Sequence, residues 1–382
     1  MDLVLSAEQE LLQQTAREFV AGRSSLKRVR SLRDGSDPDG FSRALWTEMA
    51  RLGWLGIVLP VEHDGLGLGY LELMVVMEEL GRGLMPEPML STVLLGANAL
   101  LLGGNAEQRK EHLGPVAAGE RLLALAHQEA RSRHTVHHVE TRATPAGGGW
   151  ILRGEKVHVL DGHVADRLVV TARTGGEPHD IEGITLFLVR PDAAGIRVTR
   201  QTRLDGRNAA VVRLEDTSVD RHAVLGEVDR GGALLARVID RATAALTAEM
   251  LGSMTATFDM TIDYLKTRVQ FGVPIGSFQA LKHRAARMYA ELELARSAVM
   301  HAHRTIDEGR DDAAVARAVS VAKARTSDAF MLIANEGVQL HGGIGMTDEH
   351  DIGFFLKRAR AAEQTFGDAA HHRERVAQLD GY

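Results

Sequence analysis

The strongest constraint on the fold is the helical periodicity of the C-terminal part of the chain. Apolar residues recur at three- and four-residue steps through 233–267, 278–308 and 313–340. Each such helix must cover its apolar stripe, and long helices with short connections do so by packing antiparallel to one another. The sequence therefore predicts a C-terminal four-helix bundle over residues 229–382.

Two regions with other sequence patterns precede this predicted bundle. Short β-rich runs, separated by turn-forming residues, lie at 122–126, 150–153, 168–172, 184–189, 196–199 and 211–214. They predict an antiparallel β-barrel or sandwich over residues 121–228. Residues 1–120 have helical patterns, the first opened by a capping box at Ser6 and Gln9. We therefore expect an α+β multi-domain protein with an N-terminal helical domain, a central β-domain and the bundle.

Composition excludes several classes of function. The 382 residues contain no cysteine, which excludes disulfides and thiolate chemistry and suits a reducing cytoplasm. A net charge of −6 argues against a nucleic-acid binder. No apolar run is long enough for a membrane span, and the first residues lack the regions of a signal peptide. The 17 histidines match no recognised metal-ligand spacing, so we expect no metal site.

Two segments carry candidate chemistry. In the first, a predicted helix ends near Arg268, and a glycine-bearing turn leads into the next helix near Phe278. Arginine offers a fixed fork of donors suited to a pyrophosphate. The second segment, 339–346, has three glycines in four positions, which let backbone N–H groups approach an anion or a flat ring. Taken alone, each segment could equally be a plain helix cap and turn.

Together, and in this order, these segments resemble the acyl-CoA dehydrogenase family over nearly the whole chain. The resemblance also includes the loop at 59–67 and the turn Gly154-Glu155-Lys156. The closing stretch 366–372 is similar to the small subunits of hetero-oligomeric bacterial members. The resemblance implies FAD bound between the β-domain and the bundle, with a neighbouring subunit completing the site.

The resemblance also implies residue roles for FAD. The resemblance implies that Arg268, Gln270 and Phe271 contact the dinucleotide, followed by the pair Phe278 and Gln279. It implies that Gln339, Gly342 and Gly343 reach the pyrophosphate across a subunit interface. The expected contacts to the flavin ring are Gln128 and His158. Gln128 stands in a stretch where the family usually has a hydroxyl-bearing residue, and His158 stands where it usually has a tryptophan. Leu160 stands where the family has a further hydroxyl, which leucine cannot replace. We therefore expect the flavin to bind differently or more weakly here.

The family reaction is α,β-dehydrogenation of an acyl-CoA thioester, in which a carboxylate removes the α-proton and a hydride passes to the flavin. Both positions that supply the glutamate in the family are small here, Ala242 and Gly367, and leave room for a bulky or branched acyl group. Asp368, one residue further, is the candidate base, with an N-cap of helix 369–379 as the alternative. Asp240 and Arg241 are the candidate contacts to CoA, with a surface helix residue as the alternative for Asp240.

Three functions remain open at this point. The first is a cytoplasmic FAD-dependent acyl-CoA dehydrogenase of fatty acid or steroid side-chain metabolism, which passes electrons to an electron-transferring flavoprotein. The second is a non-catalytic or FAD-completing subunit of a hetero-oligomeric dehydrogenase, favoured by the missing glutamates. The third is a flavin monooxygenase-like member of the same fold. Each is expected to form a homo-oligomer or a hetero-oligomer with a related subunit.

Overall fold

The computed structural model describes residues 4–382, and these fall into two compact units. The first, here the bundle unit, holds the described residues up to Asp34 together with Tyr70–Met85 and Thr243–Tyr382. The second, the sheet unit, holds Gly35–Gly69 and Pro86–Ala242. The boundaries predicted at 120 and 228 stay a prediction.

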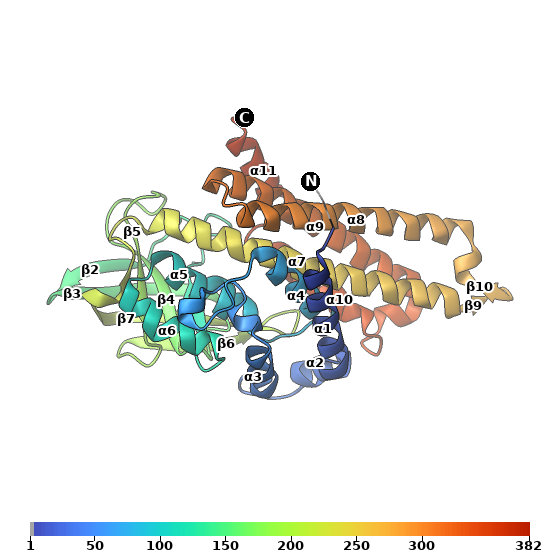
Figure 1. The fold of residues 1–382 in the computed structure, drawn as a ribbon, viewed down its shortest axis with the longest axis horizontal. Coiled ribbons are helices and arrows are strands. Elements are labelled where there is room, and N and C mark those ends of the chain that lie inside the picture. The colour runs from blue at the N-terminus through green and yellow to red at the C-terminus, as the bar shows by residue number, and fades with distance from the viewer. Residues whose placement is uncertain (1–3) are drawn as a thin grey trace. The chain divides into compact units, whose positions relative to one another are not determined.

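The bundle unit is helical (Figure 1). Its helices are α1 (Ala7–Arg23), α2 (Leu26–Asp34), α4 (Tyr70–Arg82), the later part of α7 (Gly231–Thr267), α8 (Gln279–Asp307), α9 (Asp312–His341), α10 (Ile352–Gln364) and α11 (Ala369–Leu379). Short 3₁₀ turns at Ile275–Ser277 and Gly342–Met346 and a two-stranded ribbon of β9 (Val269–Gln270) and β10 (Val273–Pro274) complete it. The predicted capping box opens α1, where the Ser6 hydroxyl accepts from the Gln9 N–H at 3.3 Å.

Close packing in the bundle unit depends on small residues. A Cβ at Gly81 of α4 would lie 2.0 Å from the carbonyl oxygen of Glu249, and one at Gly252 of α7 would lie 1.7 Å from that of Glu78. Glycine at both positions therefore lets α4 and α7 approach backbone to backbone. A buried ion pair then joins α7 to α10, since the Arg358 guanidinium donates to both carboxylate oxygens of Glu249, at 2.9 and 3.0 Å.

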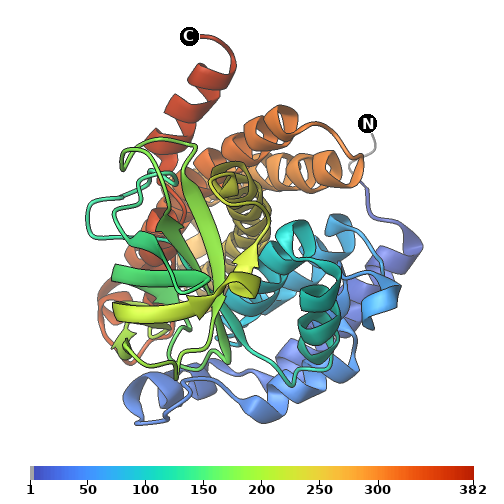
Figure 2. The same cartoon turned by 90° about the vertical axis from the view of Figure 1, so that its left-hand side faces the viewer.

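The sheet unit combines helices with one mostly antiparallel sheet (Figure 2). Its helices are α3 (Arg43–Arg51), a π-helix (Met89–Ala97), α5 (Asn98–Gly103), α6 (Ala106–Ala117), the first part of α7 up to Ala242, and 3₁₀ turns at Trp54–Gly56, Val61–His63 and Arg221–Ala223. Its strands are β1 (Leu123–Ala126), β2 (Arg142–Ala146), β3 (Gly149–Leu160), β4 (Arg167–Arg173), β5 (Ile184–Val189), β6 (Ile196–Thr202), β7 (Asn208–Asp220) and β8 (Val224–Leu225). They run in the order β6-β7-β3-β2-β4-β5-β8, and β1 pairs in parallel with β4.

The core of the sheet unit comes from apolar residues on alternate positions of these strands, such as Leu168 and Val170 of β4. The order of N-terminal helices, a mostly antiparallel sheet and C-terminal helices confirms the predicted fold class. Among residues 4–382, no helix is long and apolar enough to cross a membrane. The same residues include no cluster of three or more histidines and carboxylates arranged to hold a metal ion.

Candidate functional site

The Arg268 segment forms a hairpin at the end of α7. The Arg268 N–H donates to the Tyr264 carbonyl at 2.8 Å, and β9 then pairs with β10 so that Gln270 faces Val273. The two turn residues, Phe271 and Gly272, both have positive φ, at 54° and 79°, as the tight primed hairpin turns require. The glycine-bearing turn predicted from the sequence is therefore present.

The hairpin projects its side chains into solvent. The Phe271 side chain is 90% exposed, and its ring meets the edge of Phe278 with centroids 6.1 Å apart. Arg268, Gln270 and Gln279 are exposed as well. With Val269 and Val273, which are also exposed, these rings form an apolar patch of the kind that another molecule often covers.

The glycine segment follows α9 directly. Gly342 takes φ +64 and ends the helix, and a 3₁₀ turn runs to Met346. A Cβ at Gly342 or Gly343 would meet no atom within 4 Å, whereas one at Gly345 would lie 2.5 Å from the Val338 carbonyl oxygen. Packing within the chain thus requires glycine at position 345 but leaves the backbone at 342 and 343 open to an outside group.

These two segments lie close together within one chain. The ring of Tyr264, one turn before Arg268, stacks on His341 with centroids 4.5 Å apart. His341 immediately precedes Gly342, and Gln339 is exposed beside it. One bundle unit therefore presents both segments together, whereas the resemblance implies that the glycine segment reaches the cofactor of a neighbouring subunit. That subunit arrangement stays a prediction.

The ring-contact segments meet in the sheet unit. Gln128 lies just after β1, and its carbonyl accepts from the Val157 N–H at 2.8 Å. The register of β3 against β7 shifts between Lys156 and Val159, and His158, inside this irregularity, has φ +56. The hydrogen bond therefore brings the predicted contacts Gln128 and His158 together, with both only partly buried or exposed.

A buried ion pair, which sequence reasoning missed, lies beneath these two segments. The Lys156 ammonium donates to a Glu129 carboxylate oxygen at 2.6 Å and to the Thr171 hydroxyl at 2.9 Å, and the pair's side chains are 0% and 4% exposed. Burial lowers the pKa of Lys156 to about 8, although Glu129 opposes this shift. Burial acts to raise the pKa of Glu129, but Lys156 and hydrogen bonds outweigh it and hold that pKa below its usual range.

The loop before α11 contains the two residues considered for the base. Gly367 has φ +110, and a Cβ there would lie 2.5 Å from Cδ2 of His371. Asp368 is the N-cap of α11, because its carboxylate accepts from the His371 N–H at 2.9 Å. The capping alternative is thus present, and the role of Asp368 as a base stays a prediction. Ala242, the other glutamate position, is fully buried in α7.

A second buried lysine supports this loop and was also missed from the sequence. The Lys323 ammonium lies 2.6 Å from the Gly367 carbonyl oxygen, 2.9 Å from that of Glu363 and 3.1 Å from the Ser327 hydroxyl. Burial lowers the pKa of Lys323 to about 7, against the opposing charges of Glu363 and Asp368. Its spacing was the available signal, since residue 323 stands four positions after Val319 on the buried stripe of α9.

The candidate CoA contacts lie on α7 within the sheet unit. Asp240 is only 5% exposed, so the alternative that it is a surface helix residue is wrong. Arg241 is half-buried beside it. Their contact with CoA stays a prediction.

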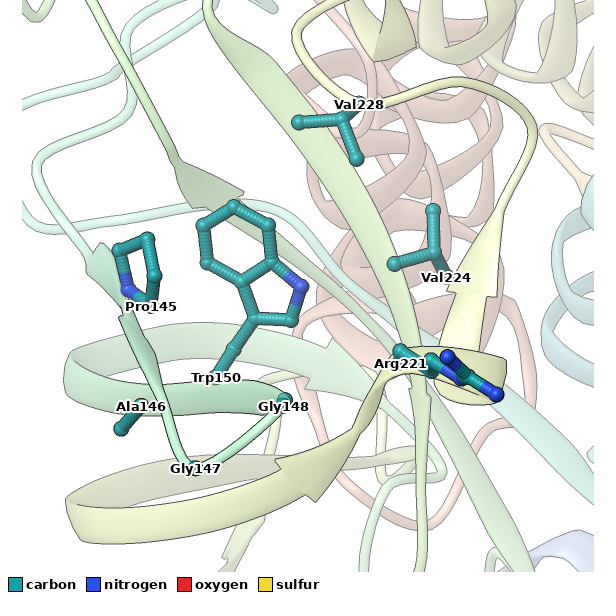
Figure 3. Close-up of a pocket in the computed structure, with 9 residues that line it drawn as sticks. Pro145, Ala146, Gly147, Gly148, Trp150, Arg221, Val224 and Val228 are labelled. Atoms are coloured by element: carbon teal, nitrogen blue, oxygen red, sulfur yellow. The ribbon is translucent and has the colours of Figure 1, made fainter.

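A pocket in the sheet unit lies apart from every predicted site residue (Figure 3). It is lined by the turn 145–149, Trp150, Arg221, Val224 and Val228. The Trp150 indole packs edge-on against Phe187 of the core with centroids 5.9 Å apart. This surface hollow therefore has no link to the predicted chemistry.

Comparison with known proteins decides the family. Three family models match successive parts of the chain: the acyl-CoA dehydrogenase N-terminal domain over residues 6–120, the middle domain over 123–217 and the C-terminal domain over 229–379. The chain belongs to the acyl-CoA dehydrogenase family. This confirms the resemblance inferred from the sequence, and members of this family generally bind FAD.

Relatives and solved structures agree with this assignment. Mitochondrial isovaleryl-CoA dehydrogenase of Pongo abelii is 32% identical over 366 residues, which cover 94% of this chain and 85% of the relative. The structure of the Tcur3481-Tcur3483 steroid ACAD is 31% identical with a TM-score of 0.86 and covers 98% of this chain and 97% of that one. The ChsE4-ChsE5 complex from Mycobacterium tuberculosis is 27% identical with a TM-score of 0.89 and covers 100% of both chains.

Proposed function

We propose that this chain takes part in the FAD-dependent α,β-dehydrogenation of an acyl-CoA thioester, bulky or branched in its acyl part, and that the electrons pass to an electron-transferring flavoprotein. The observation that carries the proposal is the exposed pair of segments at the ends of α7 and α9. An arginine fork and an open glycine backbone, placed together, suit a diphosphate.

The residues present fit FAD at its charged half. The backbone at Gly342 and Gly343 has no neighbour where a Cβ would stand, so a ligand can approach their N–H groups closely. Arg268 supplies positive charge, while Gln270, Gln279 and Gln339 supply amide donors from exposed positions. FAD, when bound, supplies the redox chemistry by accepting a hydride from the substrate.

The chain's own residues bind and orient the cofactor and the substrate. Arg268 holds the diphosphate, and Phe271 and Phe278 pack against the dinucleotide. Gln128 would hydrogen-bond the flavin ring, and His158 would contact it in place of the usual tryptophan. Asp240 and Arg241 fix the CoA arm. In this candidate function Asp368 takes the α-proton onto its carboxylate.

A second candidate function is favoured by the geometry of the base positions. At Gly367 the positive φ and the nearby His371 ring leave no room for a side chain without rearrangement, and Asp368 already caps α11. The chain is then an FAD-completing subunit whose partner supplies the base. Resemblance to chains from the Tcur3481-Tcur3483 and ChsE4-ChsE5 structures supports this assembly.

One purification experiment separates the two candidates. The chain is expressed alone and together with a homologous subunit, and flavin per chain, dye reduction with isovaleryl-CoA and α-proton exchange in D₂O are measured. Flavin and turnover in the chain alone support the dehydrogenase. Flavin that appears only in the mixed assembly supports the subunit function. Absence of flavin from both preparations contradicts the proposal as a whole.

The substitution Asp368→Asn sharpens the test. Asparagine keeps the N-cap but cannot take a proton, so it separates capping from catalysis. If Asp368 is the base, α-proton exchange is lost while the melting temperature stays close to that of the wild type. Exchange at the wild-type rate would exclude Asp368 as the base.

A further inference from the structure

The pair Lys156–Glu129 is the most deeply buried ion pair around the predicted ring contacts. Both side chains are almost completely excluded from solvent, and a buried charge pair is stabilising only when its remaining donors and acceptors are satisfied. Here Lys156 also donates to the Thr171 hydroxyl, and Glu129 also accepts from the N–H groups of Glu140 and Thr141, at 2.6 and 3.0 Å. These hydrogen bonds therefore fix the positions of both side chains.

The pair joins four segments of the sheet unit. Lys156 lies on β3 and Thr171 on β4, while Glu129 follows β1 and accepts from the segment that leads into β2. The Glu129 backbone is fixed separately, since its N–H donates to the Ser132 hydroxyl at 3.0 Å and its carbonyl accepts from the same hydroxyl at 2.9 Å. The backbone of the residues next to Glu129 in sequence is therefore restricted as well.

Those neighbours are the predicted flavin-ring contacts. Gln128 directly precedes Glu129, and His158 comes two residues after Lys156. Between them, the Val157 N–H donates to the Gln128 carbonyl at 2.8 Å. Because His158 sits in a strand irregularity with positive φ, its position is not fixed by a regular ladder and depends on the residues on either side.

We infer that Lys156 and Glu129 are positioning residues for the flavin ring: their contact sets Gln128 and His158 at the spacing that the ring requires. The inference rests on the proposed function, because only a bound flavin gives this spacing a role. Neither residue is a catalytic residue, and both act through the backbone of the segments that they join.

The test uses E129Q, K156M and the double variant E129Q/K156M of the full chain. The double variant leaves no unpaired buried charge, so it stays informative if a single variant fails to fold. The matched control is E155Q. Glu155 directly precedes Lys156 on β3, and the substitution breaks its exposed ion pair with Arg213 of β7. Each protein is checked by circular dichroism, and amide hydrogen exchange at Val157 is measured without added flavin.

The second readout is the bound flavin itself. In the assembly that carries flavin, the visible absorption bands and the reduction potential are measured for each variant. We expect Val157 exchange to rise about tenfold or more in the double variant, with shifted bands and potential, since exchange reports local opening. We expect E155Q to match the wild type in both readouts.

Two results would overturn the inference. One is unchanged Val157 exchange in a folded double variant, and the other is faster exchange with an unchanged spectrum and potential, which would leave the pair a purely structural role. If the wild type takes up no flavin in any assembly, the proposed function fails and so does the flavin role of the pair. The exchange measurement still decides separately whether the pair holds the two segments together.

Discussion

Replacing Lys323 by methionine tests the electrostatics of the loop that carries Gly367 and Asp368. The native ammonium is fully buried and contacts the Gly367 and Glu363 carbonyl oxygens and the Ser327 hydroxyl. Methionine fills similar space but leaves the two carbonyls without this donor. Each unpaired buried group costs about 1–3 kcal/mol, so we expect the variant to be less stable than the wild type at pH 9.

The difference in unfolding free energy between wild type and K323M should also depend on pH. Burial lowers the pKa of Lys323 from 10.5 to about 7 in the folded chain. Between these two values the unfolded chain holds a proton that the folded chain lacks, so the lysine makes unfolding less favourable as the pH rises. Below pH 7 both states are protonated and this contribution is flat. From pH 7 to pH 9 it amounts to roughly 2 kcal/mol.

Urea unfolding at pH 6, 7, 8 and 9 measures this contribution as the difference between wild type and K323M. The difference in unfolding free energy should widen by roughly 2 kcal/mol from pH 7 to pH 9 and stay constant below pH 7. Titrating groups that do not interact with Lys323, such as Lys156, contribute equally in both proteins and cancel. The exposed Lys282→Met is the control and should follow the wild type. A difference that is the same at pH 7 and pH 9 would refute the reasoning.

Three further predictions concern stability. Gly367→Ala should lower the melting temperature, because a Cβ would collide with a histidine ring at a positive φ, whereas Gly353→Ala, with open space around it, should not. Asp368→Ala should cost about 1 kcal/mol in urea unfolding through loss of the cap, while Asp368→Asn should cost much less. Arg358→Met should cost about 3–5 kcal/mol by removing one partner of a buried ion pair, and adding Glu249→Leu should recover part of that loss; no recovery would argue against the ion pair.

Several features of the site are predictable because they depend on local sequence. The hairpin after α7 follows from a glycine beside Phe271, and the end of α9 follows from Gly342 at a positive φ. The cap at Asp368 follows from an aspartate just before a helical pattern. Each of these involves neighbours only a few positions apart, so the residue types alone decide the backbone.

The two buried lysines were not predictable in this way. Lys156 meets Glu129 across 27 positions of sequence, and Lys323 meets the Gly367 carbonyl across 44. A lysine on a strand or helix is usually at the surface. The place of Lys323 on the apolar stripe of α9 is a signal of burial, but it does not show which distant groups accept its hydrogen bonds. The same holds for Asp240, which the helical pattern alone could not distinguish from a surface residue.

By itself the sequence determined the order of the helical and β-rich regions, the two glycine-bearing segments and the family, but not every element, since α2 and β2 were not predicted and residues 154–156, expected as a turn, lie within β3. Those properties arise from periodicity and from the backbone preferences of single residues. Only the tertiary structure decided that the ammonium groups of Lys156 and Lys323 would be withdrawn from water, and which groups would accept their hydrogen bonds. Desolvation depends on atoms that packing brings together from distant parts of the chain.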